Sequence, residues 1–600
     1  MKMDIVGQLK NSVRKILGHH YQLDVPLAEI LVSETKPEFE GDYTIVLFSF
    51  VKSLKKSPEV IGKDLGEALR KSDSGLVHSY NVIKGFLNLQ LVDSVLIEFL
   101  DKEYSNRQFG SRPKTGKKII IEYSSPNTNK PLHLGHLRNN FLGWSVASIY
   151  KMNGYDTVKT CIANDRGIHI CKSMVAWKEF ADGATPESTG IKGDHFVGDF
   201  YVMFGEEQKK QAAALRKNGL SEEDADRQSP LMQEAQQMLL DWESGKPDVM
   251  DLWKKMNAWV YEGFDVTYRK IGSDFDKIYY ESQTYLLGKD LVDAGLANHV
   301  FFKKEDGSIW IDLTADGLDQ KIVQRKDGTA VYITQDIGLV VKKYEDFHCE
   351  SSIYVVADEQ NYHFKVLKLI SQKLRLPAAD GLYHLSYGLV ELPGGRMKTR
   401  EGTVVDADDI IQEMIDIAQK HTIELGKVQD FTEAELKELY EIIGLGALKF
   451  YLVRVDPKKR IVFNPEESID FHGFTGPFVQ YTYARIRSIL RKEEIKSTSN
   501  ASEPDHYSDE PLLLLERAVL LNLEKYPAVV GQACDEMNPS VIANYAFNLA
   551  KIFNSFYTEH SVSKAESEGK KKLRLRLSEL TASVIQSSMG LLGIKVPERM

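Results

Sequence analysis

The most regular pattern of apolar positions in the chain begins at a run of three isoleucines. The segment KIIIEY (118–123) is uninterrupted, as in a parallel strand that is buried on both faces. A helix is predicted from about residue 133 to residue 152, with Gly154 placed to end it. Its apolar positions recur at spacings of four and three: Leu142, Val146 and Ile149. Since YDTVKTCIAND (155–165) resembles a second strand, these segments predict a βαβ unit and a doubly wound parallel sheet.

The same alternation predicts further strands downstream. TAVYITQDIG (329–338) and SSIYVVADEQ (351–360) both have the character of strands, and both end in carboxylates and amides. Between the two parts of the pattern, residues from about 172 to 275 are helical and polar, with an acidic patch at 221–226. We therefore expect an inserted helical subdomain that interrupts the α/β alternation.

Residues 1 to about 110 have the pattern of a small α/β module. It contains an opening helix, a strand-like segment at 41–50 and a strand at 85–92. In the second strand, the two-residue period places Asn88 on the face opposite the main apolar side chains. The polar segment 105–118 is expected to close the module and to serve as a linker.

Beyond about residue 405 the pattern becomes helical to the end of the chain. The clearest apolar stripe recurs at spacings of four, four, three and four: Val541, Tyr545, Leu549, Ile552 and Phe556. The charge-rich stretch SEGKKKLRLR (567–576) is interpreted as a solvated helix start, with a binding patch as the alternative.

Composition narrows the class of protein. At 600 residues, with 42% hydrophobic and 27% charged residues, the chain is typical of a globular protein with several domains. A net charge of −10 excludes a polycation that coats nucleic acid indiscriminately, so any such contact must be local. Four cysteines without a C-x-x-C pair, no signal-like start and no apolar run of about 18 residues predict a cytoplasmic protein with buried thiols.

The most informative segment is SSPNTNKPLHLGHLRN (124–139), which lies where the first strand turns into the first helix. The free amides and the dipole of a helix start favour an anion there, and a phosphate is the expected one. His133 and His136 lie on one face of the first turn, where both can donate hydrogen bonds. Gly135 between them leaves room for a flat base or a backbone to approach.

Other interpretations of these residues are weaker. A zinc site would need two further ligands, and no carboxylate lies on the same helical face, so no metal is expected. A pair of surface histidines would explain H-x-x-H alone, but not the whole string of polar and glycine residues between a buried strand and a helix. GSRPKTGKK (110–118) has the wrong glycine spacing for a P-loop, with Lys118 where Ser or Thr would hold magnesium.

The string EYSSPN…KPLHLGHLRN resembles the first signature of class I aminoacyl-tRNA synthetases, and of the arginyl-tRNA synthetase family in particular. Further segments resemble that family in the family's order: YITQDIG (332–338), VVADEQNYHF (355–364), GRMKTREGTVV (395–405), ALKFYLVR (447–454), QYTYARIRSIL (480–490), FNSFY (553–557) and LLGIKVPERM (591–600). Several matches in order are far more specific than one signature.

The resemblance implies an ATP-dependent activation of arginine, which places negative charge on phosphate oxygens in the transition state. His133 and His136 would supply donors, Gly135 would lie against the nucleotide, and Lys130 or Lys398 would supply positive charge. The family's second signature, KMSKS, corresponds here to RMKTR, so Thr399 replaces its clamping lysine. The resemblance therefore favours Lys130 over Lys398, with Met397 beside the nucleotide; a basic surface loop is the plain alternative.

Recognition of arginine can be argued from charge, because a guanidinium is best bound by carboxylates in a forked arrangement. Glu122, Asp336 and Gln360 each follow a predicted strand, and the carboxyl ends of strands line the crevice of an open α/β sheet. The resemblance implies that Glu122, Tyr332 and Asp336 contact the guanidinium. It assigns the α-amino group to Asn127 and Gln360.

For tRNA the resemblance implies two contact regions. Phe86 and Asn88 fall where the family's N-terminal domain reads a base of the tRNA elbow, and Tyr481 and Arg485 begin a helical region like its anticodon-binding domain. As a bare pattern, this helical region would be core with a solvated face.

Taken together, the predicted fold is a Rossmann-like α/β catalytic core, a doubly wound parallel sheet, with a small α/β N-terminal domain and an all-α C-terminal domain. The predicted boundaries are 1–110 for the elbow-binding domain, 111–465 for the catalytic domain and 466–600 for the anticodon-binding domain.

The predicted function is arginine–tRNA ligation from ATP, L-arginine and tRNA(Arg), with Mg²⁺ accompanying ATP and no structural metal. We expect a cytoplasmic monomer that binds neither membrane nor DNA, and that needs tRNA before it activates arginine. The alternatives are a class I synthetase for another amino acid and a catalytically silent tRNA-binding relative.

Overall fold

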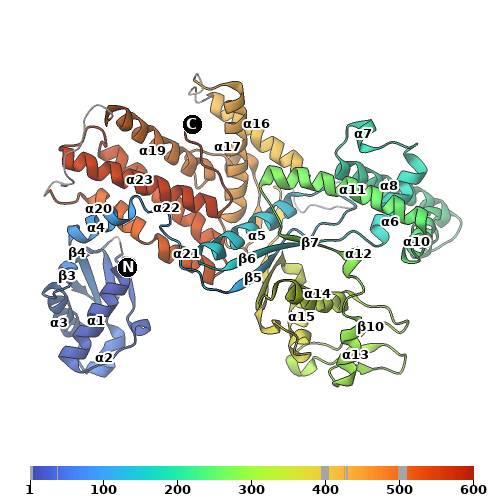
Figure 1. The fold of residues 1–600 in the computed structure, drawn as a ribbon, viewed down its shortest axis with the longest axis horizontal. Helices are drawn as coiled ribbons and strands as arrows, with labels where there is room; N and C mark the ends of the chain where they lie inside the picture. The colour runs from blue at the N-terminus through green and yellow to red at the C-terminus, as the bar shows by residue number, and fades with distance from the viewer. Residues whose placement is uncertain (1–4, 37, 394–404, 425, 427–429, 498–509) are drawn as a thin grey trace.

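A five-stranded parallel sheet forms the centre of the molecule (Figure 1). The computed structural model describes residues 5–36, 38–393, 405–424, 426, 430–497 and 510–600. The strands are β5 (Lys118–Glu122), β6 (Asp156–Ala163), β7 (Lys277–Tyr280), β11 (Ser351–Ala357) and β12 (Leu382–Tyr387). Their order is β12-β11-β5-β6-β7, and every neighbouring pair is parallel. The predicted doubly wound sheet is confirmed, with its topological switch point between β5 and β11.

The first βαβ unit has the form that the sequence predicts. Helix α5 (Leu134–Met152) joins β5 to β6, and Gly154 follows the helix with φ +86°, a conformation that glycine adopts without strain. The helix packs against the sheet on one side and against α17 (Glu433–Val453) and α21 (Tyr526–Asp535) on the other. Because it has neighbours on both sides, most of its side chains are buried, and the helix is accordingly apolar.

The segment 329–338 is a helix start, so the strand prediction was wrong. Helix α14 spans Tyr332–Phe347, and its buried residues Ile333, Ile337 and Val340 recur at spacings of four and three. A window of ten residues is too short to separate that period from the alternation of a strand. Asp336 therefore lies on a helix. The second prediction, at 351–360, is confirmed as β11, followed by the 3-10 turn η3 (Asp358–Gln360).

Smaller elements accompany the strands of the catalytic domain. They are η2 (Thr314–Asp316), α15 (Asn361–Lys373), η4 (Ala379–Gly381), β13 (Val390–Glu391) and β14 (Ile461–Val462). Before α14, the chain forms α12 (Glu281–Thr284), α13 (Lys289–Ala297) and an antiparallel sheet of β8 (Phe302–Lys303), β9 (Ile309–Ile311) and β10 (Lys321–Gln324). Strands β13 and β14 pair in parallel beyond the sheet edge.

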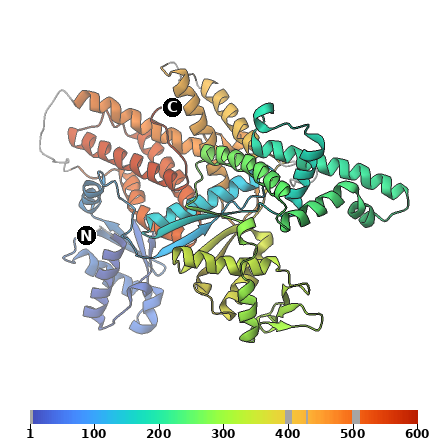
Figure 2. The same cartoon turned by 45° about the vertical axis from the view of Figure 1, so that its right-hand side comes forward.

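The predicted insertion is confirmed as helical. It consists of α6 (Ile168–Phe180), α7 (Pro186–Thr189), α8 (Gly193–Lys217), α9 (Glu222–Gln228), α10 (Pro230–Glu243) and α11 (Pro247–Ile271). These helices pack on one another and project from the end of the sheet away from the N-terminal domain in both views (Figures 1 and 2). Among the described residues, none of the helices combines the length and the apolar composition needed to cross a membrane.

The N-terminal domain is an antiparallel sheet of order β1-β2-β4-β3 covered by helices. Its elements are α1 (Ile5–Tyr21), η1 (Leu27–Glu29), β1 (Val32–Glu34), β2 (Tyr43–Val46), α2 (Phe48–Leu54), α3 (Pro58–Arg70), β3 (Val77–Ile83), β4 (Phe86–Leu91) and α4 (Asp93–Glu103). The strand expected at 41–50 is shorter, because the chain enters α2 at Phe48. Asn88 does lie opposite Leu87 and Leu89 in the pleat, yet it is also buried, so both faces of β4 are covered.

The last third of the chain is helical, as predicted. It contains α16 (Ala407–Glu424), α17, α18 (Pro465–Ser468), α19 (Gly476–Ser497), α20 (Leu514–Glu524), α21, α22 (Pro539–Glu559) and α23 (Glu568–Leu591). The predicted stripe lies on α22. The interpretation of 567–576 as a solvated helix start is wrong in part, because Lys570 and Arg574 on α23 are buried and both pair with the buried carboxylate of Glu516.

A buried charge network joins the N-terminal domain to the helical domain. The guanidinium of Arg517 on α20 pairs with Asp42 and Asp93 and donates to the carbonyl oxygen of Leu91. At the other end of the same helix, the Glu524 carboxylate accepts the Tyr43 hydroxyl at 2.5 Å. Residues separated by more than 400 positions therefore form one packed interface between the two domains.

Candidate active site

The loop after β5 is held in an unusual backbone conformation at the switch point of the sheet. Ser124 and Ser125 have φ values of +80° and +48°, which non-glycine residues rarely adopt. The amide of Ser124 donates to Asn139 Oδ1 at 2.5 Å, and its hydroxyl contacts Tyr268 at 2.6 Å. Asn139 on α5 and Tyr268 on α11 thus hold the turn that follows β5.

The two signature histidines are bound to backbone amides by the same ring atom. His133 is the N-cap of α5, and its Nδ1 accepts the Gly135 amide at 3.1 Å. His136 Nδ1 accepts the His133 amide at 3.1 Å, and the ring centroids are 3.9 Å apart. Since Nδ1 is an acceptor in both rings, the proton of each neutral imidazole resides on Nε2, which is left as a donor.

Burial makes both imidazoles neutral at physiological pH. Desolvation, assisted by the charge of Lys130, lowers the pKa of His133 to about 4 and that of His136 well below its usual value. Burial also lowers the pKa of Lys130, and no described residue forms an ion pair with this ammonium. The helix start therefore offers two neutral N–H donors beside a lysine cation that an anion can reach.

Of the predicted nucleotide contacts, Met397 and Lys398 lie outside the described residues. The chain on either side of them is described and touches α5. Val405 O accepts the Leu134 amide at 3.1 Å, and Leu132 O accepts the Ala407 amide at 3.0 Å. On the upstream side, the fully buried guanidinium of Arg138 donates to the carbonyl oxygen of Gly388. The segments that flank the second signature are thus attached to the helix that carries the first.

The two predicted carboxylates of the arginine pocket each contact a basic side chain that the sequence reasoning missed. Glu122 Oε2, at the end of β5, is 2.6 Å from the Nζ atom of Lys343. Asp336 Oδ2 is 2.6 Å from His363 Nε2 on α15. Lys343 lies on the same face of α14 as Asp336, seven residues on, a signal that could be used only if 329–338 were recognised as a helix.

A cavity of about 830 Å³ opens between the sheet, α14 and the insertion. Asn127 and Tyr332 line it, and Tyr332 is 74% exposed there. Glu122, Asp336 and Gln360 are not part of its lining. The structure therefore brings two of the five predicted arginine contacts to one cavity, with Asp336 one helical turn beyond Tyr332.

The insertion supplies one wall of this cavity, which the sequence reasoning did not find. The Arg166 guanidinium pairs with Glu243 at 2.9 Å and lies over the Tyr285 ring at 4.0 Å. Glu281 also lines the cavity, and burial raises the pKa of its carboxyl. The cavity wall thus combines a stacked cation with acidic and aromatic groups.

A cluster of charged side chains joins the insertion to the start of α16. His195 Nε2 is 3.2 Å from Asp406 and 3.4 Å from Asp408, and Lys192 Nζ is 2.6 Å from Asp408. Hydrogen bonds that His195 donates to the two carboxylates raise its pKa to about 10. Although His195, Asp406 and Asp408 lie close enough together to hold a metal ion, the lysine ammonium already neutralises Asp408. The cluster is therefore an ionic contact between the insertion and the start of α16.

The predicted tRNA contacts occupy two distant surfaces. Phe86 is exposed and packs edge-on against Phe48 at 5.6 Å, whereas Asn88 is buried and accepts the Thr44 hydroxyl at 2.7 Å. In the helical domain, the Arg485 guanidinium lies over the Tyr481 ring at 4.9 Å. Its Nη1 donates to Asn554 at 2.6 Å.

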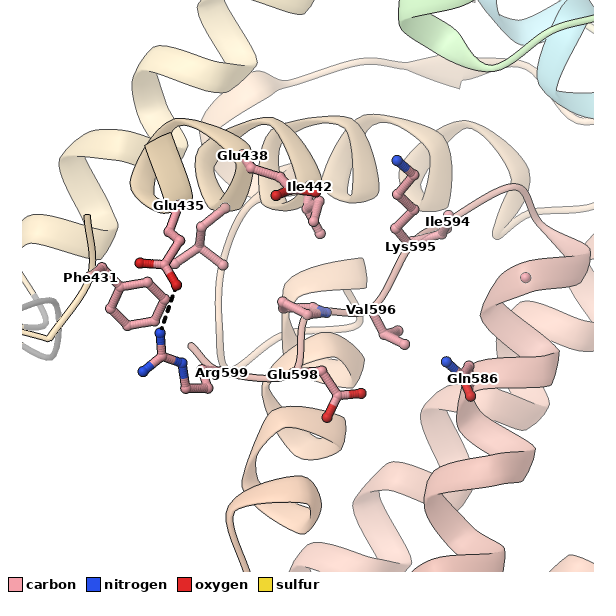
Figure 3. A pocket seen from close by; sticks show the side chains of 13 residues that line it. Phe431, Glu435, Glu438, Ile442, Gln586, Ile594, Lys595, Val596, Glu598 and Arg599 are labelled. Atoms are coloured by element: carbon pink, nitrogen blue, oxygen red, sulfur yellow. Dashed lines mark hydrogen bonds and ion pairs between the residues drawn. The ribbon is translucent and has the colours of Figure 1, made fainter. Parts of the chain in front are cut away.

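A second hollow, of about 500 Å³, lies between α17, α23 and the last residues of the chain (Figure 3). Figure 3 shows Arg599 reaching Glu435 across its mouth, a contact of 3.1 Å. Glu598 pairs with Arg487 on α19 at 2.8 Å. The hollow holds none of the predicted site residues, but these contacts attach the chain end beside the helix that carries Tyr481 and Arg485.

Three family profiles match successive parts of the chain. The family profile described as tRNA synthetases class I (R), catalytic domain, matches residues 100–464. Profiles described as DALR anticodon binding domain and as arginyl tRNA synthetase N terminal domain match residues 479–600 and 7–91.

Among curated proteins, the arginine–tRNA ligases of Amoebophilus asiaticus and Bacteroides thetaiotaomicron are 49% and 50% identical to the chain, over the full length of both partners. Among solved structures, the arginyl-tRNA synthetase of Thermus thermophilus has a TM-score of 0.79 at 25% identity and covers 99% of each chain. The arginyl-tRNA synthetase of Plasmodium falciparum shares the fold with a TM-score of 0.75 at 17% identity, covering both chains fully.

Proposed function

The chain belongs to the arginyl-tRNA synthetases, class I ligases that use ATP to join arginine to tRNA, and we propose which of its residues perform each part of that reaction. The observation that carries the assignment is the start of α5. Two neutral Nε2–H donors and the Lys130 ammonium converge beside the switch point of the sheet, whereas the Leu134 and Gly135 amides are already bound within the protein.

The nucleotide is assigned to this helix start. His133 and His136 donate to phosphate oxygens, and Gly135 lies against the nucleotide. Lys130 stabilises the charge that develops when the arginine carboxylate attacks the α-phosphate and pyrophosphate leaves. Met397 and Lys398 complete the phosphate side, with Lys398 in the smaller role. No catalytic base is needed, because a carboxylate is already ionised at neutral pH. Magnesium arrives with ATP as part of the substrate.

Arginine is assigned to the adjacent crevice. Glu122, Tyr332 and Asp336 bind the guanidinium, while Asn127 and Gln360 bind the α-amino group. The placement of Asn127 and Tyr332 at one cavity supports this assignment, as does the burial of Glu122 beside it. Buried or half-buried carboxylates favour a permanently charged guanidinium over a neutral side chain.

For tRNA we assign the exposed ring of Phe86 to a base of the elbow and the Tyr481–Arg485 pair to the anticodon region. Stacking on aromatic rings and on guanidinium planes is how single-stranded bases are bound. Asn88 supports Phe86 from within the sheet, and it reaches a base only if its bond to Thr44 is exchanged. We further propose that the chain acts as a cytoplasmic monomer, divided at 1–110, 111–465 and 466–600.

The test is exchange of labelled pyrophosphate into ATP, with arginine and then lysine, each with and without tRNA. We expect exchange with arginine only, and only when tRNA is present. Exchange that is faster with lysine would favour a class I synthetase for another amino acid. No exchange with either, in protein that still binds tRNA, would favour a catalytically silent relative.

A further inference from the structure

Lys343 is a buried cation that none of the assignments above uses. It lies on α14 with 1% of its side chain exposed, and its Nζ is 2.6 Å from Glu122 Oε2. The same ammonium lies over the Tyr354 ring of β11, 4.4 Å from the centroid. Isolated burial of a lysine costs several kcal/mol, so such a residue needs a partner, and here the partner is a proposed substrate contact.

The contacts of Glu122 leave one side of its carboxylate open. Among the described residues, both polar contacts of the side chain are to Oε2: the Lys343 ammonium, and the Thr160 hydroxyl at 3.4 Å. Oε1 is therefore the oxygen that remains for a ligand. The ammonium at Oε2 fixes the orientation of the carboxylate plane. A forked contact with a guanidinium requires such a fixed orientation.

The charges around Glu122 are also balanced by this lysine. Burial alone would lower the pKa of Lys343, but the Glu122 carboxylate more than offsets this, and the pKa is raised above its usual value. The other titratable groups that face Glu122 are neutral, because burial raises the pKa of Cys161 and of Tyr354 to about 12, and that of Tyr279 further. The Lys343 ammonium is therefore the counter-charge of the Glu122 carboxylate.

We propose that Lys343 is a positioning residue for arginine recognition, which holds Oε2 of Glu122 and so turns its Oε1 toward the guanidinium. This rests on the proposed function, in which Glu122 contacts arginine. It differs from that assignment because Lys343 itself does not touch the substrate. The lysine acts through the carboxylate, so its effect must vanish when the carboxylate is removed.

The experiment compares four variants of the full chain by calorimetric titration with arginine: Lys343→Met, Glu122→Gln, the double variant, and Lys342→Met. Lys342 is a matched control, since it is the preceding lysine of the same helix and pairs with Asp346 at the surface. We expect Lys343→Met and Glu122→Gln each to raise the arginine Kd at least about tenfold. The double variant should be no weaker than Glu122→Gln alone, and Lys342→Met should bind as the unmodified chain does.

The KM values for arginine and for ATP separate a positioning role from a purely structural one. The KM for arginine should rise in Lys343→Met while the KM for ATP stays within about twofold.

The outcomes distinguish the two claims. If Glu122→Gln leaves the arginine Kd unchanged, the proposed arginine site is wrong. If Glu122→Gln weakens binding and Lys343→Met does not, or if the two effects add in the double variant, the role of Lys343 is overturned. If Lys343→Met does not fold, Lys343→Gln keeps a donor to Oε2 without the charge, and the same comparison with Glu122→Gln decides.

Discussion

Charged side chains are buried in two regions of this molecule, and the two regions satisfy them differently. At the interface between the N-terminal domain and the helical domain, one guanidinium has three partners: Arg517 contacts Asp42, Asp93 and the Leu91 carbonyl oxygen. Each partner comes from the N-terminal domain. The network is closed, because its donors and acceptors are used within the protein.

In the crevice of the catalytic domain the pairs are open. Among the described residues, Glu122 has one ionic partner, Lys343, and Asp336 has one, His363. A carboxylate can accept about four hydrogen bonds, so a single partner leaves capacity for a ligand. In this molecule the closed network holds two domains together, whereas the open pairs keep acceptor oxygens for the substrate that we propose.

The comparison also changes what a deletion would measure. Deletion of residues 1–105 tests whether the N-terminal domain binds the tRNA elbow, and it should weaken tRNA charging. The structure adds a second consequence, because the deletion would expose Arg517 and Glu524 on the helical domain without their partners. Substitutions of single residues are therefore the sharper way to compare the two regions.

The largest effect is expected in the closed network. Arg517→Met should lower the free energy of unfolding by about 3–5 kcal/mol, because the side chain of Asp42 would stay buried, and that of Asp93 partly buried, without a counter-ion. Chemical denaturation measures this. Arg70→Met, which removes an exposed pair with Glu67, is the control and should leave the transition unchanged. A loss no larger than that of the control would mean that the interface is not held by its charges.

The next effect concerns the cation of the open region that has no described ionic partner. Lys130→Ala should lower kcat for adenylate formation by about 10²–10³, the equivalent of roughly 2.7–4 kcal/mol, with little change in the KM for ATP. The reason is that the ammonium acts on charge that develops only in the transition state. Pyrophosphate exchange with tRNA present measures it, and a normal kcat would transfer the role to Lys398.

A smaller effect is expected at the solvent-facing carboxylate. Asp336→Asn should raise the KM for arginine at least about tenfold, or roughly 1.4 kcal/mol, with the stability of the chain unchanged. Asp346→Asn, on the same helix but paired with Lys277 away from the cavity, is a matched control. An unchanged KM would remove Asp336 from the pocket and leave its contact with His363 as a structural one.

The last effect depends on pH and is expected at the ionic contact between the insertion and α16, where His195 is 30% exposed. The pKa of His195 is raised to about 10 in the folded chain, above about 6.5 in the unfolded chain. Its stabilisation is therefore complete below about pH 6.5 and is lost as the pH rises through about 10. The stability difference between the unmodified chain and His195→Gln should shrink over this range, with His472→Gln as the control for loss of an exposed imidazole. A difference that is constant with pH would contradict the protonated pair.

The sequence by itself determined the central βαβ unit, the helical insertion and the helical C-terminal region. The apolar residues of these segments recur over long stretches with the spacing of one element type only. The buried face and the local backbone structure therefore agree. It also determined the helix start at His133 and His136, because the residues of a signature string are neighbours along the chain. Resemblance over several ordered segments led to the family that the comparisons show.

Only the tertiary structure decided how the charges are paired. Glu122 and Lys343 are 221 positions apart, and Arg517 is 475 positions from Asp42. The interpretation of 567–576 as a solvated helix start was wrong in part for the same reason. Lys570 and Arg574 are buried because they pair with Glu516 on another helix. A charge is stable inside a protein only beside its partner, and the chain order does not reveal which partner the fold will bring to it.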